Sequence, residues 1–426
     1  TPDWKKIGDF YNSYSYPYNK IQRFFRKIVK SLYFNRHLPL NKIFFGLKKK
    51  KKFLSLGSFD KIKKNFIYNT KNYYYHIEWV DIIAENNLKN INEEKLLKKI
   101  NYFSEIVLNP ILKMIQLNRI SKKFTKGLDF EIILSSWKNR ITDIYKINYS
   151  LKLSTNVNQL LITECGNPFH KLIGALYKSK NTTVVNFTHG NDFCFIDKRW
   201  THNYLMSTCN YYVFETNKIS NAFAKNRSNL MLDFKEKVKY TNIKKSNFFQ
   251  LNNNYLNNKK NNKEIMLIGY PMNVMRYTDD AYCFFHYRLK LELHLLKELN
   301  KTKFDITYKA HPDRLKELGN IYNTEVKKIN SQKLENIWEE SEALVFTYAT
   351  TTTFGFALTR PIPIILIAPE SNLWIKKRKK LLENRVSFLS PHNEFNYKEI
   401  NYKKLQVAIE EAKNKINVNK FNKLIN

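Results

Sequence analysis

Residues 343–367 read ALVFTYATTTTFGFALTRPIPIILI, and this stretch carries the clearest structural signal in the chain. Two apolar runs, ALVF and IPIILI, enclose a patch of threonines at 347 and 350–353 and a small-residue segment, TFGFAL. This order predicts a buried strand, a turn, a short helix and a second parallel strand. A longer first strand would also explain the threonines, because threonine favours strands. The alternative is a turn whose hydroxyls and helix N–H groups bind an anion.

Strands and helices alternate in the same way on the N-terminal side of this stretch. Further strand-like runs are QLLITE (159–164), TTVVNFTHG (182–190), YYVFET (211–216), IMLIGYP (265–271), FDITYKAHP (304–312) and EVKKI (325–329), with helix-like segments between most of them. The alternation predicts parallel sheets covered by helices. An Asn- and Lys-rich segment separates two groups of strands and is typical of a polar linker.

We therefore expect an α/β protein with two Rossmann-like domains that face a cleft, preceded by a helical extension. The expected parts are a mostly helical N-terminal region (1–150), a first Rossmann-like domain (151–238), the polar linker (239–264), a second Rossmann-like domain (265–400) and a C-terminal helix (401–426). Open sheets of this kind bind ligands at the carboxyl ends of their strands. The residues just after each strand are therefore the candidates for function.

The charge of the chain is strongly positive, with 73 Lys and Arg against 37 Asp and Glu and a net charge of +36. Such a balance favours polyanionic partners, either nucleic acid or an anionic membrane surface. A bias toward A/T-rich codons is a competing explanation, since Lys, Asn, Ile, Phe and Tyr are all abundant. The run Lys48–Lys52, between IFFGL and FLSL, is a candidate membrane contact, although a solvated loop explains it equally.

Other features of the sequence narrow the class of protein. No apolar stretch approaches the length of a membrane-spanning helix, and the first residues lack the apolar core of a signal peptide. The four cysteines form no CxxC pair and no disulfide framework. We expect a cytoplasmic protein.

Two strand ends of the first domain carry candidate catalytic side chains. Glu164 follows one strand, and Asn167 leads into the next helix, where it could bind substrate or only cap the helix. His189 and Gly190 follow the next strand. Histidine is a natural general base near neutral pH, although a lone histidine is often structural.

The second domain offers candidate ligands for a phosphate. Lys309 and His311 flank the end of one strand, and Arg314 lies in the helix that follows. A helix N-terminus beside these cations suits an anion, although a simple capped helix is the alternative. The threonine patch adds Thr350, Thr351 and Thr352.

Two further residues at strand ends, Gly269 and Glu370, are candidate substrate contacts. The chain has no GxxxxGK[ST] motif and no His, Cys, Asp and Glu set at metal-ligand spacing. We expect neither a metal nor a cofactor.

The order of these features resembles that of GT-B transferases of bacterial surface polysaccharide biosynthesis. This group includes capsular and lipopolysaccharide Kdo transferases, polysialyltransferases and CDP-glycerol glycerophosphotransferases. The resemblance rests on THG after a strand of the first domain, HP after a strand of the second, and the hydroxyl-rich turn before ALTRPIPIIL. It covers residues 158–370, about half of the chain, and departs in having threonine where many relatives carry serine.

The resemblance implies a GT-B fold and an inverting, metal-independent glycosyltransferase that takes sugar from a nucleotide-activated donor, with a CMP-linked donor favoured. The acceptor would be a cell-surface polysaccharide or lipid-linked glycan, on the inner face of the cytoplasmic membrane. The first domain would then serve the acceptor and the second the donor. His311 and Thr350–Thr352 would hold the donor phosphate, and His189 would be the base, as in the glycerophosphotransferases.

Three other functions are compatible with the same sequence. The first is a glycerophosphotransferase that uses CDP-glycerol. The second is a basic nucleic-acid-binding protein, with aromatic side chains that stack on bases; dispersed basic residues and the lack of an RNP or helix-turn-helix motif argue against it. The third is a non-catalytic scaffold of the same fold.

Overall fold

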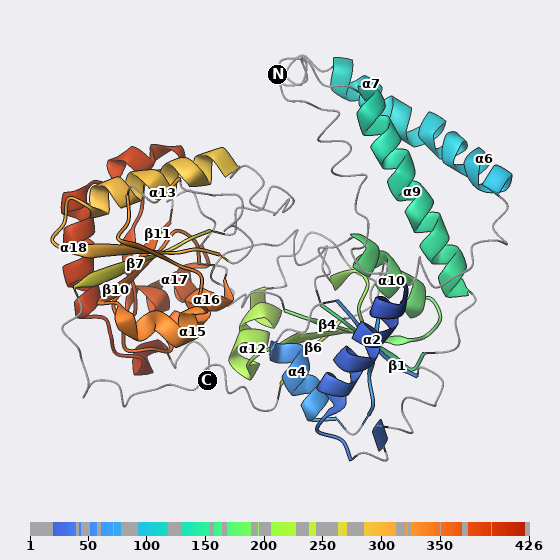
Figure 1. Cartoon of the computed structure of the whole chain (residues 1–426), viewed down its shortest axis with the longest axis horizontal. Coiled ribbons are helices and arrows are strands. Elements are labelled where there is room, and N and C mark those ends of the chain that lie inside the picture. The colour runs from blue at the N-terminus through green and yellow to red at the C-terminus, as the bar shows by residue number, and fades with distance from the viewer. Residues whose placement is uncertain are drawn as a thin grey trace. The chain divides into compact units, whose positions relative to one another are not determined.

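The structure is a computed structural model, and it describes residues 20–39, 42–43, 52–57, 61–70, 72–77, 93–117, 130–152, 157–163, 168–188, 195, 206–226, 238–243, 263–270, 285–311, 321–322, 325–349, 351–368, 374–392 and 394–421. These residues form two six-stranded sheets (Figure 1). The chain divides into two compact units, the first made of Thr1–Phe187, Leu205–Tyr211 and Glu236–Val238 and the second of the remainder. The boundary crosses the first sheet, because most of its last two strands falls in the second unit.

The first sheet has the strand order β2-β1-β3-β4-β5-β6. Its strands are β1 (Phe53–Leu56), β2 (Tyr75–Ile77), β3 (Gln159–Ile162), β4 (Thr183–Phe187), β5 (Tyr211–Phe214) and β6 (Lys239–Asn242). The registers of β1 with β2 and β3, and of β3 with β4, are parallel. Side chains on both faces of β3 are fully buried, as expected for a parallel sheet covered by helices. The strand order changes direction between β1 and β3.

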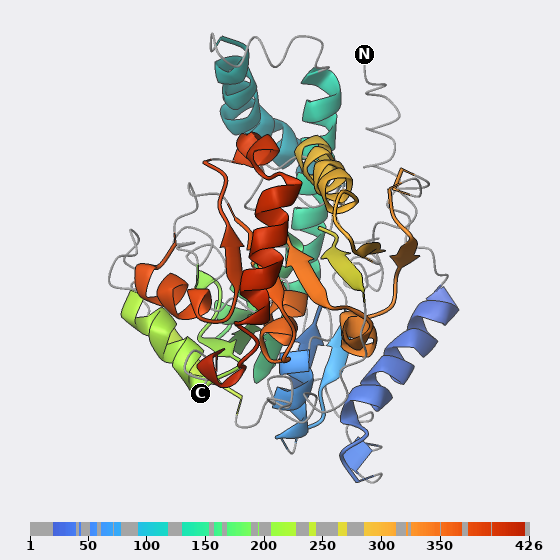
Figure 2. The same cartoon turned by 90° about the vertical axis from the view of Figure 1, so that its left-hand side faces the viewer.

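Helices cover the first sheet and extend beyond it. They are α2 (Lys20–Asn35), α4 (Lys61–Tyr68), α6 (Glu93–Phe103), α7 (Asn109–Leu117), α9 (Phe130–Lys152), α10 (Pro168–Lys178) and α12 (Asn217–Asn226). A π-helical turn, Ser104–Leu108, joins α6 to α7. This α6–α7 pair packs along α9 and projects from the sheet (Figures 1 and 2).

The second sheet has the strand order β12-β11-β10-β7-β8-β9. Its strands are β7 (Glu264–Ile268), β8 (Asp305–Lys309), β9 (Lys328–Asn330), β10 (Ala343–Phe346), β11 (Ile364–Ile367) and β12 (Ser387–Leu389). All five pairings are parallel. Strand β7 lies in the middle of the sheet, with β8 and β9 on one side of it and β10, β11 and β12 on the other. This is the dinucleotide-binding strand order, with its switch point between β7 and β10.

The two faces of the second sheet are covered by different helices. The helices are α13 (Phe285–Leu299), α15 (Leu334–Ile337), α16 (Thr352–Leu358), α17 (Lys376–Glu383) and α18 (Tyr402–Lys413). Apolar side chains of α13 and α18 join those of β7, β8, β10 and β11 in one buried core. On the opposite face, Phe354 of α16 packs edge-on against Phe346, with 5.1 Å between ring centroids.

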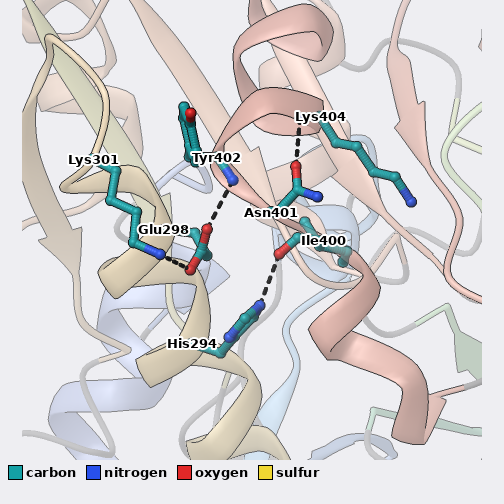
Figure 3. Close-up of polar contacts among 7 residues, drawn as sticks. All are labelled: His294, Glu298, Lys301, Ile400, Asn401, Tyr402 and Lys404. Carbon is teal, nitrogen blue, oxygen red and sulfur yellow. Dashed lines mark hydrogen bonds and ion pairs between the residues drawn. The ribbon is translucent and has the colours of Figure 1, made fainter.

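Figure 3 shows how polar contacts fix α13 to the start of α18. Glu298 of α13 accepts a hydrogen bond from the backbone N–H of Tyr402 at 2.8 Å and forms an ion pair with Lys301. His294 Nε2 lies 2.7 Å from the carbonyl oxygen of Ile400. The side chain of Asn401 caps α18 by accepting from a backbone N–H of the first turn. A carboxylate and an amide oxygen therefore satisfy the free N–H groups that begin this helix.

The fully buried Arg385 binds the C-terminal end of α16. Arg385 donates to the carbonyl oxygens of Ala357 and Leu358, at the end of α16, and also to those of Arg360 and Lys415. Burial lowers the pKa of its guanidinium to about 9, so the group remains charged at neutral pH. A cation at a helix C-terminus complements the helix dipole, so Arg385 stabilises α16 and the turn that follows.

The predicted α/β fold with two parallel Rossmann-like sheets is confirmed. Strands β3, β4, β5, β7, β8, β10 and β11 lie where the apolar runs predicted them. Strands β1 and β2, which lie in the region expected to be mostly helical, and strand β12 were not predicted. Strand β6 lies in the segment expected to be a polar linker. The bounds predicted for the domains stay a prediction.

Candidate functional site

The carboxyl ends of β7, β8 and β10 lie side by side at one edge of the second sheet. The parallel register pairs Phe346 with Ile268 and Ile268 with Lys309, so one row crosses the three strands. The backbone N–H of Gly269, the next residue of β7, donates to the Lys309 carbonyl at 3.0 Å. This edge contains the switch point, where sheets of this kind bind ligands.

Lys309 is the most distinctive side chain of this edge. The residue is only 6% exposed, and among the described residues its ammonium donates one hydrogen bond, to the carbonyl oxygen of Ala310 at 3.1 Å. Burial lowers the pKa of Lys309, and Glu335 of α15 opposes this shift. Among the described residues no carboxylate lies within ion-pair distance of it. An ammonium has three N–H donors, so this group retains capacity for an anion.

His311 follows two residues after Lys309 and is half-buried. Side chains two residues apart lie on the same face of an extended chain, so we expect the side chains of Lys309, at the end of β8, and His311 to lie on one face. The backbone N–H of Ala310, between them, continues the ladder by donating to Asn330 of β9 at 2.9 Å. Lys309 is thus fixed by the sheet, and His311 lies at its margin.

The threonine patch divides between the end of β10 and the start of α16. Thr351 is the N-cap of α16, and its hydroxyl accepts from the backbone N–H of Thr353 at 3.3 Å. Thr352 and Thr353 already belong to the helix, so the turn is shorter than expected. The hydroxyl of Thr347 is buried, with no hydrogen-bond partner among the described residues. The longer-strand alternative is therefore wrong, because β10 ends at Phe346.

Gly269 is required by the packing beneath this edge. A Cβ atom at this position would lie 2.3 Å from the phenolic oxygen of Tyr308. That oxygen cannot move away easily, because it donates to the buried carboxylate of Glu292 at 2.7 Å. Glu292 also accepts from the backbone N–H of Tyr270 at 2.7 Å and from the hydroxyl of Tyr322 at 2.9 Å. The glycine lets the turn after β7 lie directly on this hydrogen-bonded group.

A second residue of α13 braces the end of β10. Arg288 is buried, donates to the carbonyl oxygen of Thr347 at 3.0 Å, and stacks over the ring of Tyr270 at 4.3 Å. Tyr348 packs edge-on against the same ring and donates to the Gly269 carbonyl at 3.4 Å. Burial raises the pKa of Tyr348, and a hydrogen bond to Thr351 opposes this. The turns after β7 and β10 are therefore held by shared contacts.

The first sheet also places a buried lysine at its switch point, but this lysine has a different environment. Lys63 of α4 is fully buried and donates to the carbonyl oxygens of Leu56 and Gly57, at 3.0 and 3.3 Å, and to the hydroxyl of Thr163 at 3.3 Å. All three N–H donors therefore have an oxygen acceptor in the protein. Lys63 thus ties together the ends of β1 and β3.

His170 of α10 completes this group. Its Nδ1 lies 3.1 Å from the Thr163 carbonyl oxygen. Gly57 has φ of 79°, and a Cβ atom there would lie 2.8 Å from the same oxygen and 2.9 Å from the His170 ring. A glycine is therefore needed at the end of β1 for both reasons.

Five of the predicted site residues are described and belong to the ends of three adjacent strands or to the segments that follow them: Gly269 follows β7, Lys309 and His311 lie at and just after the end of β8, and Thr351 and Thr352 begin α16 after β10. The other candidates lie outside the described residues: Glu164, Asn167, His189, Gly190, Arg314, Thr350 and Glu370. Lys48–Lys51 lie outside them as well. Glu292 and Arg288, which lie four residues apart on α13, were not predicted. Two opposite charges at this spacing in a helix-like segment were the available signal.

Two wider properties of the described residues bear on the site. They include no group of three or more His, Cys, Asp and Glu side chains arranged to hold a metal ion. None of the helices in this part of the chain is both long and apolar enough to span a membrane.

No protein-family model and no curated protein matches the sequence. Solved structures similar to this chain include the glycosyltransferase SnogD from Streptomyces nogalater, at 9% identity and TM-score 0.43, covering 88% of this chain and 95% of that one. They also include UDP-N-acetylglucosamine 2-epimerase from Rickettsia bellii, at 12% identity and TM-score 0.43, with 88% and 93% covered. A spinosyn rhamnosyltransferase solved with thymidine diphosphate is a third, at 8% identity and TM-score 0.37, with 83% and 82% covered. These scores are low, so the proposal below rests on the residues of the site.

Proposed function

We propose that this protein is a GT-B glycosyltransferase that binds a nucleotide-activated sugar at the carboxyl edge of its second sheet. A CMP-linked donor is favoured, and the acceptor is a cell-surface polysaccharide or a lipid-linked glycan. The observation that carries the proposal is the Lys309 ammonium, which is buried at this edge and has a single described acceptor. A buried cation without a carboxylate partner costs free energy unless an anion reaches it. A donor phosphate is such an anion.

The other groups of the edge have roles consistent with this proposal. His311 donates a hydrogen bond to a phosphate oxygen, and Arg314 is a second candidate ligand of the phosphate. Thr350 and Thr352 contribute hydroxyls, whereas Thr351 is already used to cap α16. The brace made by Glu292 and Arg288 keeps the edge rigid, so the donors lie in position before the leaving phosphate gains charge. Gly269 brings the backbone close to the nucleotide, and Glu370 is a candidate contact to it.

The transfer step needs a base on the acceptor side. His189 removes the proton of the acceptor hydroxyl as that oxygen attacks the anomeric carbon, and the bond to the donor phosphate breaks with inversion. Glu164 is the alternative base, and Asn167 and Gly190 contact the acceptor. The leaving nucleotide takes the electron pair of the broken bond, and Lys309 and His311 stabilise its charge. Because protein cations supply this stabilisation, the reaction proceeds without a divalent metal.

Thermal denaturation with candidate ligands tests the proposal. A ligand that binds only the folded state raises the free energy of unfolding, by about 2.7 kcal/mol at a concentration 100 times its Kd. We expect CMP or a CMP-sugar to raise the melting temperature more than UDP or dTDP does. Stabilisation by CDP-glycerol with transfer of glycerophosphate would instead favour the glycerophosphotransferase. Stabilisation by RNA alone, with steep salt dependence, would contradict both.

Variants of the two histidines separate binding from chemistry. His311→Ala is expected to lose donor affinity and turnover together, because it removes a phosphate ligand. His189→Ala is expected to lose turnover with little change in donor affinity, because a base acts only in the reaction. EDTA is expected to leave the wild-type rate unchanged. Unchanged turnover in both variants would refute these assignments, and loss of turnover in EDTA would refute the metal-independent step.

A further inference from the structure

Helix α2 exposes a stripe of large apolar side chains to solvent. Phe25 is 61% exposed and Val29 is 62% exposed, and Leu32 and Tyr33 are exposed as well. Their separations of four, three and one residues place them along one side of the helix. Large exposed apolar stripes on a soluble surface indicate a binding surface.

The opposite side of α2 is fixed to the first sheet. Asn35 donates to the carbonyl oxygen of Tyr74 at 2.9 Å and accepts from the N–H of the same residue at 2.9 Å. The Ser31 hydroxyl accepts from the N–H of His76, in β2, at 3.2 Å. Ser31 and Asn35 are fully buried. The apolar stripe is therefore held facing outward by contacts made on the other side of the helix.

The charge of α2 is entirely positive. The helix contains Lys20, Arg23, Arg26, Lys27 and Lys30, and it contains no Asp or Glu. Arg36, just beyond its end, stacks over the ring of Tyr33 at 4.6 Å, and Lys64 of α4 lies 5.5 Å from the same ring. An exposed apolar stripe on a helix whose charged residues are all basic matches the interface of an anionic bilayer. Apolar side chains enter the acyl boundary there while Lys and Arg meet the phosphates.

We propose that α2 binds this protein to the surface of a membrane that contains anionic phospholipids. The helix lies in the plane of the interface and buries Phe25, Val29 and Leu32. A nucleic acid would satisfy the cations but would leave the apolar stripe in water, which is why a membrane is the better occupant. The proposal does not depend on the transferase activity.

Co-sedimentation of the full chain with vesicles tests this proposal. We expect binding to vesicles of phosphatidylcholine and phosphatidylglycerol at 7:3, and much weaker binding to phosphatidylcholine alone. The double substitution Phe25→Ser with Val29→Ser is expected to weaken binding by at least about tenfold, because it removes apolar surface from the interface. Its melting temperature should stay that of the wild type, since both side chains are exposed. Val407→Ser is the matched control, on the 68% exposed valine of α18.

A charge pair completes the test. Lys30→Glu is expected to weaken binding about 25-fold, since each unit of charge near an anionic surface changes binding about fivefold. Lys403→Glu, on the exposed side of α18, is the control and should change it far less. Equal loss in α2 and α18 variants would overturn the proposal. It would also be overturned if only Met114→Ser, on the α6–α7 pair, abolished binding, or if the chain bound single-stranded RNA but no vesicle.

Discussion

Gly269 illustrates how a residue chosen as a candidate ligand has a clear packing role. Gly269 was a candidate because it follows a strand. In the structure it lies directly on the phenol of Tyr308. That phenol is held by Glu292, which is fully buried and accepts hydrogen bonds from three groups. The absence of a side chain thus lets the β7 turn lie on a polar group buried in the core.

Replacing Gly269 with alanine is expected to lower the free energy of unfolding by about 1–3 kcal/mol, the usual cost of forcing a methyl group into a packed core. Urea denaturation would measure it. The double variant Gly269→Ala with Tyr308→Phe should recover part of the loss relative to additivity, because the nearest atom is removed. Strictly additive effects would show that the contact with Tyr308 is not what requires the glycine.

Lys309 and Lys63 show what a sequence can and cannot reveal about individual side chains. Lys309 was a candidate because it follows an apolar run, and this position is now explained by the register of β8 with β7. Its burial depends on segments far away in the sequence, such as α15. The absence of a carboxylate partner among the described residues depends on such segments as well. Lys63 gave no signal, since it lies in a lysine-rich segment whose fold depends on contacts with β1 and β3.

The junction between α13 and α18 depends on a carboxylate that is paired in the folded state. The hydrogen bond from Lys301 lowers the pKa of Glu298. Burial opposes this by a smaller amount, and the backbone N–H of Tyr402 adds a smaller lowering effect. A lowered pKa in the folded state stabilises the protein above the unfolded pKa, about 4.3 for glutamate. This stabilisation is lost as the pH falls through the folded-state pKa.

Glu298→Gln is therefore expected to reduce the free energy of unfolding by about 1 kcal/mol at pH 7, in line with other helix-capping carboxylates. The difference from wild type should shrink as the pH falls below 4. Urea denaturation at pH 7 and pH 3.5 would measure this. Glu410→Gln, on an exposed ion pair with Lys413, is the control and should change stability by less than about 0.5 kcal/mol. A difference that stays constant with pH would contradict the assigned role.

Strands could be predicted from the sequence where their own residues determine them. Apolar runs such as ALVF and IMLI bury both faces of a parallel strand, which is why β7, β10 and β11 could be predicted from composition. Strands β1 and β2 are three or four residues long, and each is stabilised by pairing with its sheet neighbours. Their own sequences, FLSL and YHI, carry too little periodicity to reveal them.

The order of the strands across both sheets explains where the candidate groups gather. In each sheet the strand order reverses once, between β1 and β3 in the first sheet and between β7 and β10 in the second. Lys63, at the first point, is saturated by protein oxygens, whereas Lys309, one strand away from the second point, is not, among the residues described. The topology was predictable only in outline, because strand order depends on pairings between segments far apart in the chain.

Calorimetric titration tests the claim that Lys309 binds the phosphate of a nucleotide donor. CMP, CDP, UDP and dTDP are titrated into the wild-type protein and into two lysine variants. Lys309→Met is expected to weaken every nucleotide that the wild type binds by roughly thirtyfold or more, the cost of removing one partner of a buried charge pair. Its melting temperature should equal or exceed that of wild type, since a buried ammonium is removed. Lys63→Met should lower the melting temperature and leave nucleotide affinity within about threefold of wild type, because Lys63 already has its three acceptors. Unchanged affinity in Lys309→Met, or a wild-type protein that binds none of the four nucleotides, would contradict the claim.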